Sequence, residues 1–327
     1  MIKKLIIKIK ESYCCVLLRV VLQQLSESFV IAEHIKNSKF SQTPEKIKTE
    51  ILITLHALEK GMSIGNGRIG FGKEKCKNLI SLLNLFLTAG GDADFVKKSV
   101  SMINGYIAFN KSAGADMMEI EKLLSEFCKE FKIEDRDVEN GIINMQIERD
   151  VKELPFDRFS STRFSVRDLS NKRIDIEIIK KALVLAERTP SACNRQSWRV
   201  HVYTDERLKN NVFKLQGGAK GFYEKLQSAI IICADIRRYG INELNLPFVD
   251  GGLYGMNLLY ALHYYGLATI PLTMGHKQGT LRILKKELSL PANEIPVLLV
   301  GVGSYCDTYK VARSERLPYN SYTTFNF

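Results

Sequence analysis

The chain has 327 residues, of which 45% are hydrophobic and 25% are charged. A chain of this length can bury one large core or two ordinary ones, and nothing in the composition points to intrinsic disorder. The formal net charge of +11 makes nucleic acid, anionic membrane and phosphate-bearing small molecules the candidate partners. Because lysines and arginines are spread along the chain and not gathered in one tract, we expect no nucleic-acid binding.

The seven cysteines form no C-x-x-C pair and show no regular spacing. This pattern supports neither a zinc cluster nor a thioredoxin-like site, so we expect no metal. Reduced thiols in a cytoplasmic compartment are the simplest interpretation.

The N-terminal residues need separate treatment. Residues 1–10 alternate basic and apolar side chains, and an apolar run over 13–22 follows, broken by Arg19. The run is shorter than the roughly 20 apolar residues of a spanning helix and lacks the cleavage site of a signal peptide. Two alternatives remain open. Residues 1–25 either rest on anionic lipid at the inner face of the membrane or form a helix that docks on its own protein, and the periodicity favours docking.

The first half of the chain is expected to be helical almost throughout. Apolar residues recur at intervals of three and four over 44–60, 73–87, 92–110 and 117–131, with a weaker pattern over 139–151. The segments between these ranges are short and rich in Gly, Ser and Asn, as connections between helices are.

The second half alternates helices with short β-branched runs. Strands are predicted over 200–203, 229–234 and 297–302, and helices over 175–187, 252–265 and 279–288. This alternation predicts an α+β or α/β fold with a central sheet, in which the strand over 229–234 is buried on both faces. We therefore divide the chain into a helical region of unknown role, residues 1–152, and a second domain, residues 153–327.

A glycine-rich segment over 65–70 fits the pattern G-x-G-x-x-G. That pattern indicates dinucleotide binding only where it follows a strand and opens a helix. Here a helical stretch precedes it, so we interpret the segment as a loop between helices.

Three segments of the second half carry polar groups suited to a ligand. Arg163, Ser165 and Arg167 alternate, so an extended backbone would point all three the same way, as donors for a phosphate. Residues 189–198 combine small side chains with uncharged hydrogen-bonding groups, which suit the edge of a heteroaromatic ring. Residues 310–318 form a basic segment after the last strand.

Together these segments resemble the nitroreductase family of FMN enzymes. The resemblance rests on R-x-S-x-R at 163–167, P-S-A-x-N-x-Q-x-W at 190–198, D-G-G at 250–252 and R-L-P at 316–318. It covers roughly the second half of the chain. It implies an FMN-binding α+β fold with a central mixed sheet flanked by helices, after an all-helical N-terminal region.

The resemblance also implies roles for individual residues. Arg163, Ser165 and Arg316 match ligands of the FMN phosphate, and Arg167 matches a basic position near the pyrimidine end of the flavin. Two residues before the position of Arg316, the family often carries a basic residue. This chain has Ser314 there, and the neighbouring Arg313 is the candidate to supply the missing charge. A further group matches segments that contact the flavin, the first four of them across the interface of a homodimer: Pro190, Ser191, Ala192, Asn194, Gln196, Pro271, Leu272 and Thr273.

The activity that this implies is flavin-mediated. NADH or NADPH passes hydride to flavin N5, and an electron-poor small molecule such as a nitroaromatic or a quinone then accepts it. No side-chain acid or base is required. Two alternatives stay open: a flavin-dependent dehydrogenase or tailoring enzyme of a biosynthetic pathway, and a non-catalytic, membrane-associated scaffold.

The remaining candidates have plainer interpretations. Cys193 is expected to be a small buried thiol, and His201 and His263 are expected to be structural. His276 follows a glycine near the expected flavin edge and is the one histidine predicted to contact substrate.

Overall fold

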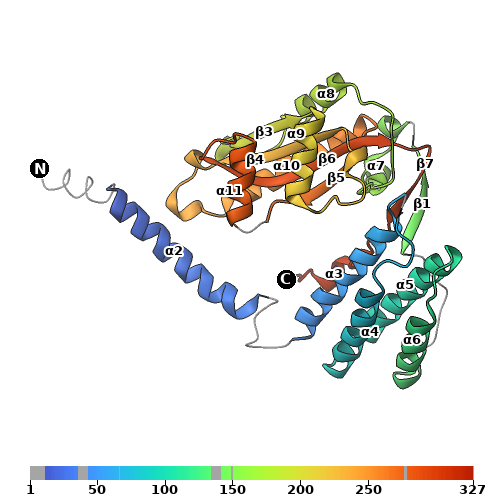
Figure 1. Ribbon diagram of the computed structural model, residues 1–327. Helices are drawn as coiled ribbons and strands as arrows, with labels where there is room; N and C mark the ends of the chain where they lie inside the picture. The colour runs from blue at the N-terminus through green and yellow to red at the C-terminus, as the bar shows by residue number, and fades with distance from the viewer. Residues whose placement is uncertain are drawn as a thin grey trace, which may run out of the picture. The chain divides into compact units, whose positions relative to one another are not determined.

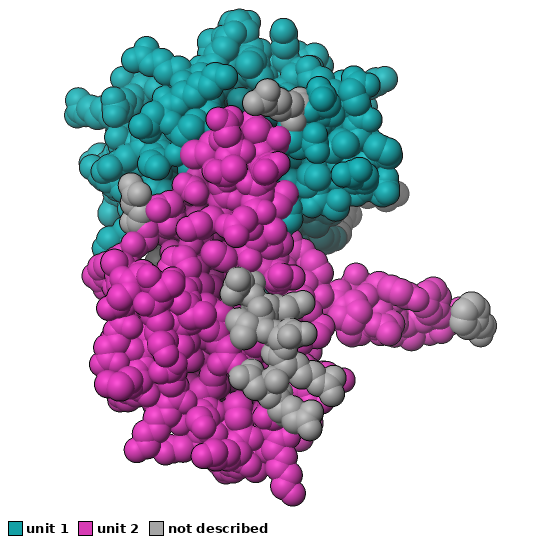
Figure 2. All heavy atoms as spheres, turned by 90° about the vertical axis from the view of Figure 1, so that its right-hand side faces the viewer, with its two compact units in different colours: residues 1–42, 148–164, 169–305 teal, residues 43–147, 165–168, 306–327 magenta. Residues whose placement is uncertain are grey.

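The computed structural model describes residues 12–35, 43–65, 67–133, 141–148, 150–275 and 278–326. The chain forms two compact units, each assembled from separate stretches and coloured separately in Figure 2. Unit 1 contains residues 1–42, 148–164 and 169–305, and unit 2 contains residues 43–147, 165–168 and 306–327. The sequence suggested one boundary, after residue 152. The two units instead divide the chain at several points, because residues 306–327 complete unit 2.

Unit 1 is built on a five-stranded sheet (Figure 1). Its order is β2-β6-β4-β3, and β5 pairs with β6 as well. Every residue of β4 is buried, which confirms that this strand is central. All pairs among the described strands are antiparallel, so the parallel component of the expected mixed sheet does not occur among them. The strands are β2 Leu169–Ser170, β3 Trp198–Tyr203, β4 Ser228–Asp235, β5 Ala268–Thr273 and β6 Glu294–Tyr305.

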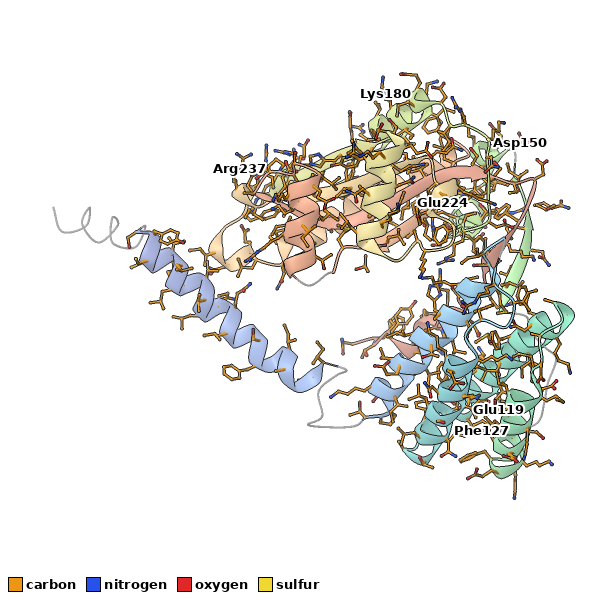
Figure 3. The ribbon with its side chains drawn as sticks, in the orientation of Figure 1. Glu119, Phe127, Asp150, Lys180, Glu224 and Arg237 are labelled. Atoms are coloured by element: carbon orange, nitrogen blue, oxygen red, sulfur yellow. The ribbon has the colours of Figure 1, made fainter. Side chains whose placement is uncertain are left out.

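Helices cover both faces of this sheet. Helices α8 and α10 pack on the face formed by residues such as Ile230 and Val300, where Leu258 and Leu262 are fully buried. Helix α9 packs on β3 and β4, and α11 packs on α9. The expected α+β fold is therefore confirmed. The helices are α2 Tyr13–His34, α7 Phe156–Thr162, α8 Ile176–Ala186, α9 Glu206–Gln216, α10 Leu246–Tyr264 and α11 Gln278–Glu287; Lys180, Glu224 and Arg237 mark unit 1 in Figure 3.

Unit 2 is a helical bundle with a two-stranded sheet. Thr43 caps α3 and Asp92 caps α5, because their side-chain oxygens accept hydrogen bonds from helix amides, which fixes both starts. Phe127 of α6 is buried in the core and Glu119 of the same helix is exposed (Figure 3). The elements are α3 Pro44–Met62, α4 Lys73–Thr88, α5 Ala93–Ser112, α6 Met118–Glu130, β1 Ile142–Gln146 and β7 Thr308–Ala312.

Short 3₁₀ helices join these elements. They are η1 Val151–Glu153, η2 Ala192–Asn194, η3 Tyr223–Lys225, η4 Ile236–Arg238, η5 Ile241–Glu243 and η6 Tyr319–Ser321. The glycine-rich segment predicted as a loop follows α3 directly, and its described residues are not helical, which confirms that prediction.

The weak helix expected over 139–151 is wrong. Residues 142–146 form β1, which pairs antiparallel with β7, so its backbone groups bond to a strand far along the chain. The basic segment over 310–318 was expected to follow the last strand. Its first residues instead belong to β7, the partner of β1. Helix α9 and strand β5 were not predicted, and α10 begins at Leu246 instead of 252.

The N-terminal apolar run forms helix α2, and residues 1–11 lie outside the described residues. Tyr13 is 79% exposed and Phe29 is 76% exposed, and Leu18 and Leu22 are exposed as well. Helix α2 contacts the segment of η5, so docking on its own chain and contact with lipid both stay predictions for residues 1–25. No helix among the described residues combines the length and apolarity needed to cross a membrane.

Candidate functional site

The segment over 190–196 is an exposed loop with an unusual backbone. Cys193, Asn194 and Gln196 have φ angles of 49°, 54° and 48°. Non-glycine residues rarely adopt this left-handed region, which costs of order 1–3 kcal/mol each and is typical of functional loops held in place by their surroundings. Surrounding hydrogen bonds must therefore maintain this conformation.

Helix α10 supplies one set of these bonds through Asp250, which is 1% exposed. Its Oδ1 accepts from the backbone amide of Ala192 at 3.0 Å, and its Oδ2 accepts from the Tyr239 hydroxyl at 2.7 Å. Within the loop, Ser191 Oγ accepts from the amide of Gln196 at 2.9 Å. Both oxygens of a buried carboxylate are thus used to fix the loop and its neighbour.

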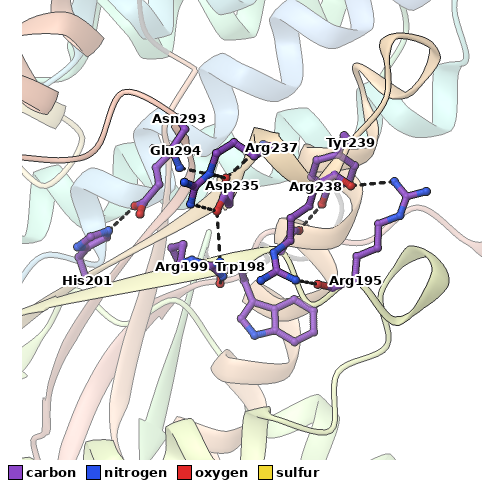
Figure 4. Close-up of polar contacts among 11 residues, drawn as sticks. Arg195, Trp198, Arg199, His201, Asp235, Arg237, Arg238, Tyr239, Asn293 and Glu294 are labelled. Atoms are coloured by element: carbon purple, nitrogen blue, oxygen red, sulfur yellow. Dashed lines mark hydrogen bonds and ion pairs between the residues drawn. The ribbon is translucent and has the colours of Figure 1, made fainter.

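A second set of bonds holds the other side of the loop. Arg195 donates two hydrogen bonds of 2.7 Å to Glu243, and this pairing lowers the pKa of Glu243 to about 2. Arg238 donates to the carbonyl of Arg195 at 2.8 Å (Figure 4). The loop is therefore fixed from two directions, while Pro190, Asn194 and Gln196 remain exposed.

Unit 2 contains a second group of predicted residues. A bridge between Val166 and Val311 places Ser165 and Arg167 beside β7. Arg167 is 4% exposed; its Nη1 donates to the carbonyl of Ser165 at 3.3 Å, and its Nε has no hydrogen-bond partner among the described residues. An unsatisfied buried N–H on a cation is costly, so the arrangement favours an added acceptor.

The surroundings of Arg167 are rich in positive charge. Burial lowers the pKa of Arg167 to about 10, and nearby Glu59 offsets part of that effect. The pKa of Lys60 is also lowered, first by burial and then by the Arg167 charge. Arg167 stays charged at neutral pH. A buried arginine and a partly buried lysine next to one carboxylate suit an anionic or electron-rich ligand.

Glu59 also lines a cavity of about 380 Å³ within unit 2. Arg316 lies on its wall and donates to the carbonyl of Ser314, and the amide of Ser314 donates to Glu59 at 3.3 Å. The cavity is within the size range of small-molecule sites. The rest of its wall combines apolar side chains (Leu52, Leu55, Phe95, Met102, Leu317 and Pro318) with polar and charged ones (Lys48, Asp92, Asp94, Lys98, Ser99, Glu315 and Ser321).

The other predicted residues lie elsewhere in their units. Pro271, Leu272 and Thr273 end strand β5, and the Thr273 carbonyl accepts from Gln216 at 3.0 Å. The backbone amide of Arg313 donates to Gly141 at 3.1 Å. Unit 1 thus brings together the residues of loop 190–196, and unit 2 brings Ser165 and Arg167 beside the segment of Arg313.

Cys193 and His263 differ in their exposure to solvent. Cys193 is exposed, so the buried thiol expected there is wrong, because its left-handed backbone lies in the exposed loop. His263 is 3% exposed, lies within hydrogen-bonding distance of Thr162 and Tyr305, and is structural as expected. Burial, and then the Arg163 charge, lowers its pKa to about 4. His276 lies outside the described residues.

Three residues of these networks had no predicted role. Tyr239 and Glu243 act on the loop from segments that follow β4, and Asp250 acts from α10. The D-G-G sequence at 250–252 was the one available signal, because an acidic residue next to two glycines on an apolar helix needs a partner.

Known proteins resemble part of this chain. The model of the family described as "Nitroreductase family" matches residues 161–304. An iodotyrosine deiodinase from Haliscomenobacter hydrossis is 26% identical over 181 residues, covering 46% of this chain and 80% of that protein. A protein from Archaeoglobus fulgidus, provisionally named NADH dehydrogenase/NAD(P)H nitroreductase, is 28% identical over 147 residues, covering 43% of this chain and 80% of that protein.

Among solved structures, an FMN-dependent nitroreductase from Clostridium difficile is 20% identical with a TM-score of 0.44, covering 51% of this chain and 96% of that one. The segment matched by the family model contains loop 190–196, the whole five-stranded sheet except the last residue of β6, and the Arg163–Arg167 segment. The match to the nitroreductase family thus spans residues 161–304, which is less than half of the chain.

Proposed function

We propose that the protein is an FMN-dependent oxidoreductase that carries hydride from NADH or NADPH to an electron-poor small molecule, such as a nitroaromatic or a quinone. The observation that carries the proposal is Arg167, a buried cation whose Nε lacks a partner among the described residues. FMN supplies the hydride-transfer chemistry, and the protein supplies binding, orientation and charge.

The residues of the chain would divide this work. In unit 2, Ser165 and Arg316 would bind the phosphate, with Arg313 as an additional cation; Arg163 lies in unit 1, and its role as a phosphate ligand stays a prediction. Arg167 would stabilise negative charge on the reduced ring, because a fixed cation at the point where charge develops needs no reorganisation. The residues present fit the group, since an electron-rich acceptor satisfies the open Nε of Arg167.

We further propose a homodimer in which loop 190–196 reaches the flavin of the partner. Helix α10, which holds the loop through Asp250, exposes a set of large apolar side chains that a second copy would cover. Glycine at 252 has no atom near the position of an added Cβ, so this face is open. The exposed apolar residues are Phe248, Val249, Leu253 and Met256.

The test is an absorbance spectrum of the purified protein before and after FMN addition and desalting, followed by anaerobic NADH or NADPH. Retained flavin that bleaches with nicotinamide supports the proposal. If no flavin is retained at high FMN, the roles of Arg163, Ser165 and Arg316 are wrong.

A second candidate is a flavin enzyme that modifies a biosynthetic intermediate. The cavity of about 380 Å³ in unit 2 favours it, because this space lies outside the domain matched by the family model and is lined by α3 and α5. Retained flavin that nicotinamide does not reduce would support this candidate over the first.

A non-catalytic, membrane-associated scaffold is the third candidate, favoured by the exposed apolar side chains of α2. Co-sedimentation with anionic vesicles, with and without residues 1–25, tests it, and failure of the full chain to pellet excludes it. We propose the cytoplasm, including the inner face of the membrane if pelleting occurs, because the spacing of the cysteines in the sequence does not indicate a disulfide framework.

A further inference from the structure

Three metal-ligating side chains meet on unit 1 although they lie far apart in the sequence. His201 comes from β3, Cys233 from β4 and Glu294 from β6, and one ligand atom of each lies within 4.8 Å of the other two. The His201 Nε2 and Glu294 Oε2 atoms are 2.6 Å apart (Figure 4). We propose that His201, Cys233 and Glu294 bind one divalent transition-metal ion, with Zn²⁺ as the preferred ion.

The strand register explains why these side chains converge. His201 lies opposite Ile231, and Cys233 is two residues further along β4, so both side chains lie on the same face of the sheet. Glu294 lies opposite Asp235, two residues beyond Cys233, and is therefore on this face too. The irregularity in the β4–β6 pairing between Ile232 and Cys233 lies at this point. The three ligands thus come from three neighbouring, hydrogen-bonded strands.

The arginines near Glu294 bind another carboxylate, that of Asp235. Asp235 accepts hydrogen bonds from Arg199, Arg237 and Asn293, and those from Arg237 and Asn293 hold its pKa well below its usual range. The two arginines are therefore bound to Asp235, and Glu294 is left to His201. The ion pair of His201 and Glu294 is with each other, so the carboxylate, the imidazole and the neighbouring thiol form a usable donor set.

Burial distinguishes the three ligands. Cys233 is fully buried and Glu294 is 6% exposed, while the His201 side chain is 29% exposed. The site is therefore closed on the protein side and open at the histidine, where water would complete four-coordination. Burial raises the pKa of the Cys233 thiol to about 12. Metal binding would form the metal–sulfur bond and release the thiol proton to solvent.

The donor set selects the ion. Thiolate and imidazole favour Zn²⁺ and related ions, whereas Mg²⁺ and Ca²⁺ prefer oxygen ligands throughout. The competing interpretation is a metal-free hydrogen bond between His201 and Glu294, beside a cysteine that takes no part. The two interpretations differ in whether the Cys233 sulfur bonds to an added metal.

The experiment is a Co²⁺ titration of the full chain after chelation, followed by near-ultraviolet absorbance. We expect a thiolate-to-cobalt charge-transfer band that saturates at one equivalent per chain and that Zn²⁺ abolishes. Cys233→Ser and Cys233→Ala should lose the band, and the exposed-cysteine control Cys193→Ser should keep it. His201→Gln should weaken Co²⁺ binding at least about tenfold.

Each contrary result is decisive. Absence of the band in the unmodified protein with excess Co²⁺ overturns the proposal, and this result needs no variant that folds. Retention of the band in Cys233→Ser also overturns it. Circular dichroism of each variant separates loss of metal binding from loss of folding. None of these readouts depends on FMN, so the metal site and the proposed function are tested separately.

Discussion

The backbone amide of Ala192 donates a hydrogen bond of 3.0 Å to the buried carboxylate of Asp250. This bond connects an exposed loop with left-handed residues to the longest helix that packs on the sheet of unit 1. Because the second oxygen of Asp250 accepts from Tyr239, one side chain fixes the loop and the segment after β4 together. The loop geometry therefore depends on α10.

Asp250→Asn should destabilise unit 1 and weaken FMN retention. Asparagine provides one acceptor oxygen where the carboxylate provides two, so one buried donor loses its partner, at a cost of about 1–3 kcal/mol. Chemical denaturation measures the first effect and FMN titration the second. Exposed Glu224→Gln is the matched control. Unchanged stability of Asp250→Asn would contradict the role assigned to this carboxylate.

Arg167→Ala should slow flavin reduction by nicotinamide about 100-fold, the effect of removing one donor from a site of developing negative charge. FMN should still bind, because other residues hold the phosphate. Anaerobic stopped-flow absorbance measures the reduction rate, and exposed Arg158→Ala is the control. An unchanged rate in Arg167→Ala would remove this residue from the proposed mechanism.

Stability should fall as the pH drops from about 6.5 to about 4, and His263 should cause part of the loss. The pKa of His263 is about 4 in the folded protein, below the usual 6.5 of an unfolded histidine. Between these values the unfolded state binds more protons, so acid favours unfolding, by up to about 3 kcal/mol in total. Below about pH 4 both states are protonated and this contribution is fully lost.

Urea denaturation at pH 7 and pH 5 measures this dependence. His263→Gln should show a smaller difference between the two pH values than the unmodified protein, because glutamine does not titrate. The control is His56→Gln, at a half-exposed position on α3. Equal pH differences in the unmodified protein and His263→Gln would assign the effect to other groups.

Leu253→Asp should convert the proposed homodimer to monomer, because it places a charge in the centre of the exposed apolar face of α10. Val184→Asp on α8, at another exposed apolar position, should leave the oligomeric state unchanged. Light scattering coupled to size-exclusion chromatography measures both. A dimer that persists in Leu253→Asp excludes this face as the interface.

Local patterns predicted much of the fold. Helix α3 was expected from its apolar spacing, and the structure adds a Thr43 cap and Pro44 in its first turn. The central position of β4 followed from apolar side chains on both of its faces. Strands β1 and β7 could not be predicted, because Ile142 pairs with Ala312 and no local signal identifies so distant a partner.

In the candidate site, too, local sequence identified residues whose surroundings depend on distant parts of the chain. The alternating R-x-S-x-R spacing identified Arg167, but its burial and its open Nε depend on the packing of unit 2. The role of Asp250 depends on a contact across 58 residues of chain. Likewise His201, Cys233 and Glu294 have no metal-ligand spacing in the sequence, since three separate strands bring them together.

The pairing of β1 with β7 also constrains biosynthesis. The two strands belong to the same unit, yet residues 147–307 separate them along the chain. During translation, therefore, the helices of unit 2 emerge from the ribosome long before the strand that completes them. A nascent chain must keep β1 from pairing with other strands until residues 308–312 are released. A fragment that ends at residue 147 would keep this edge exposed permanently.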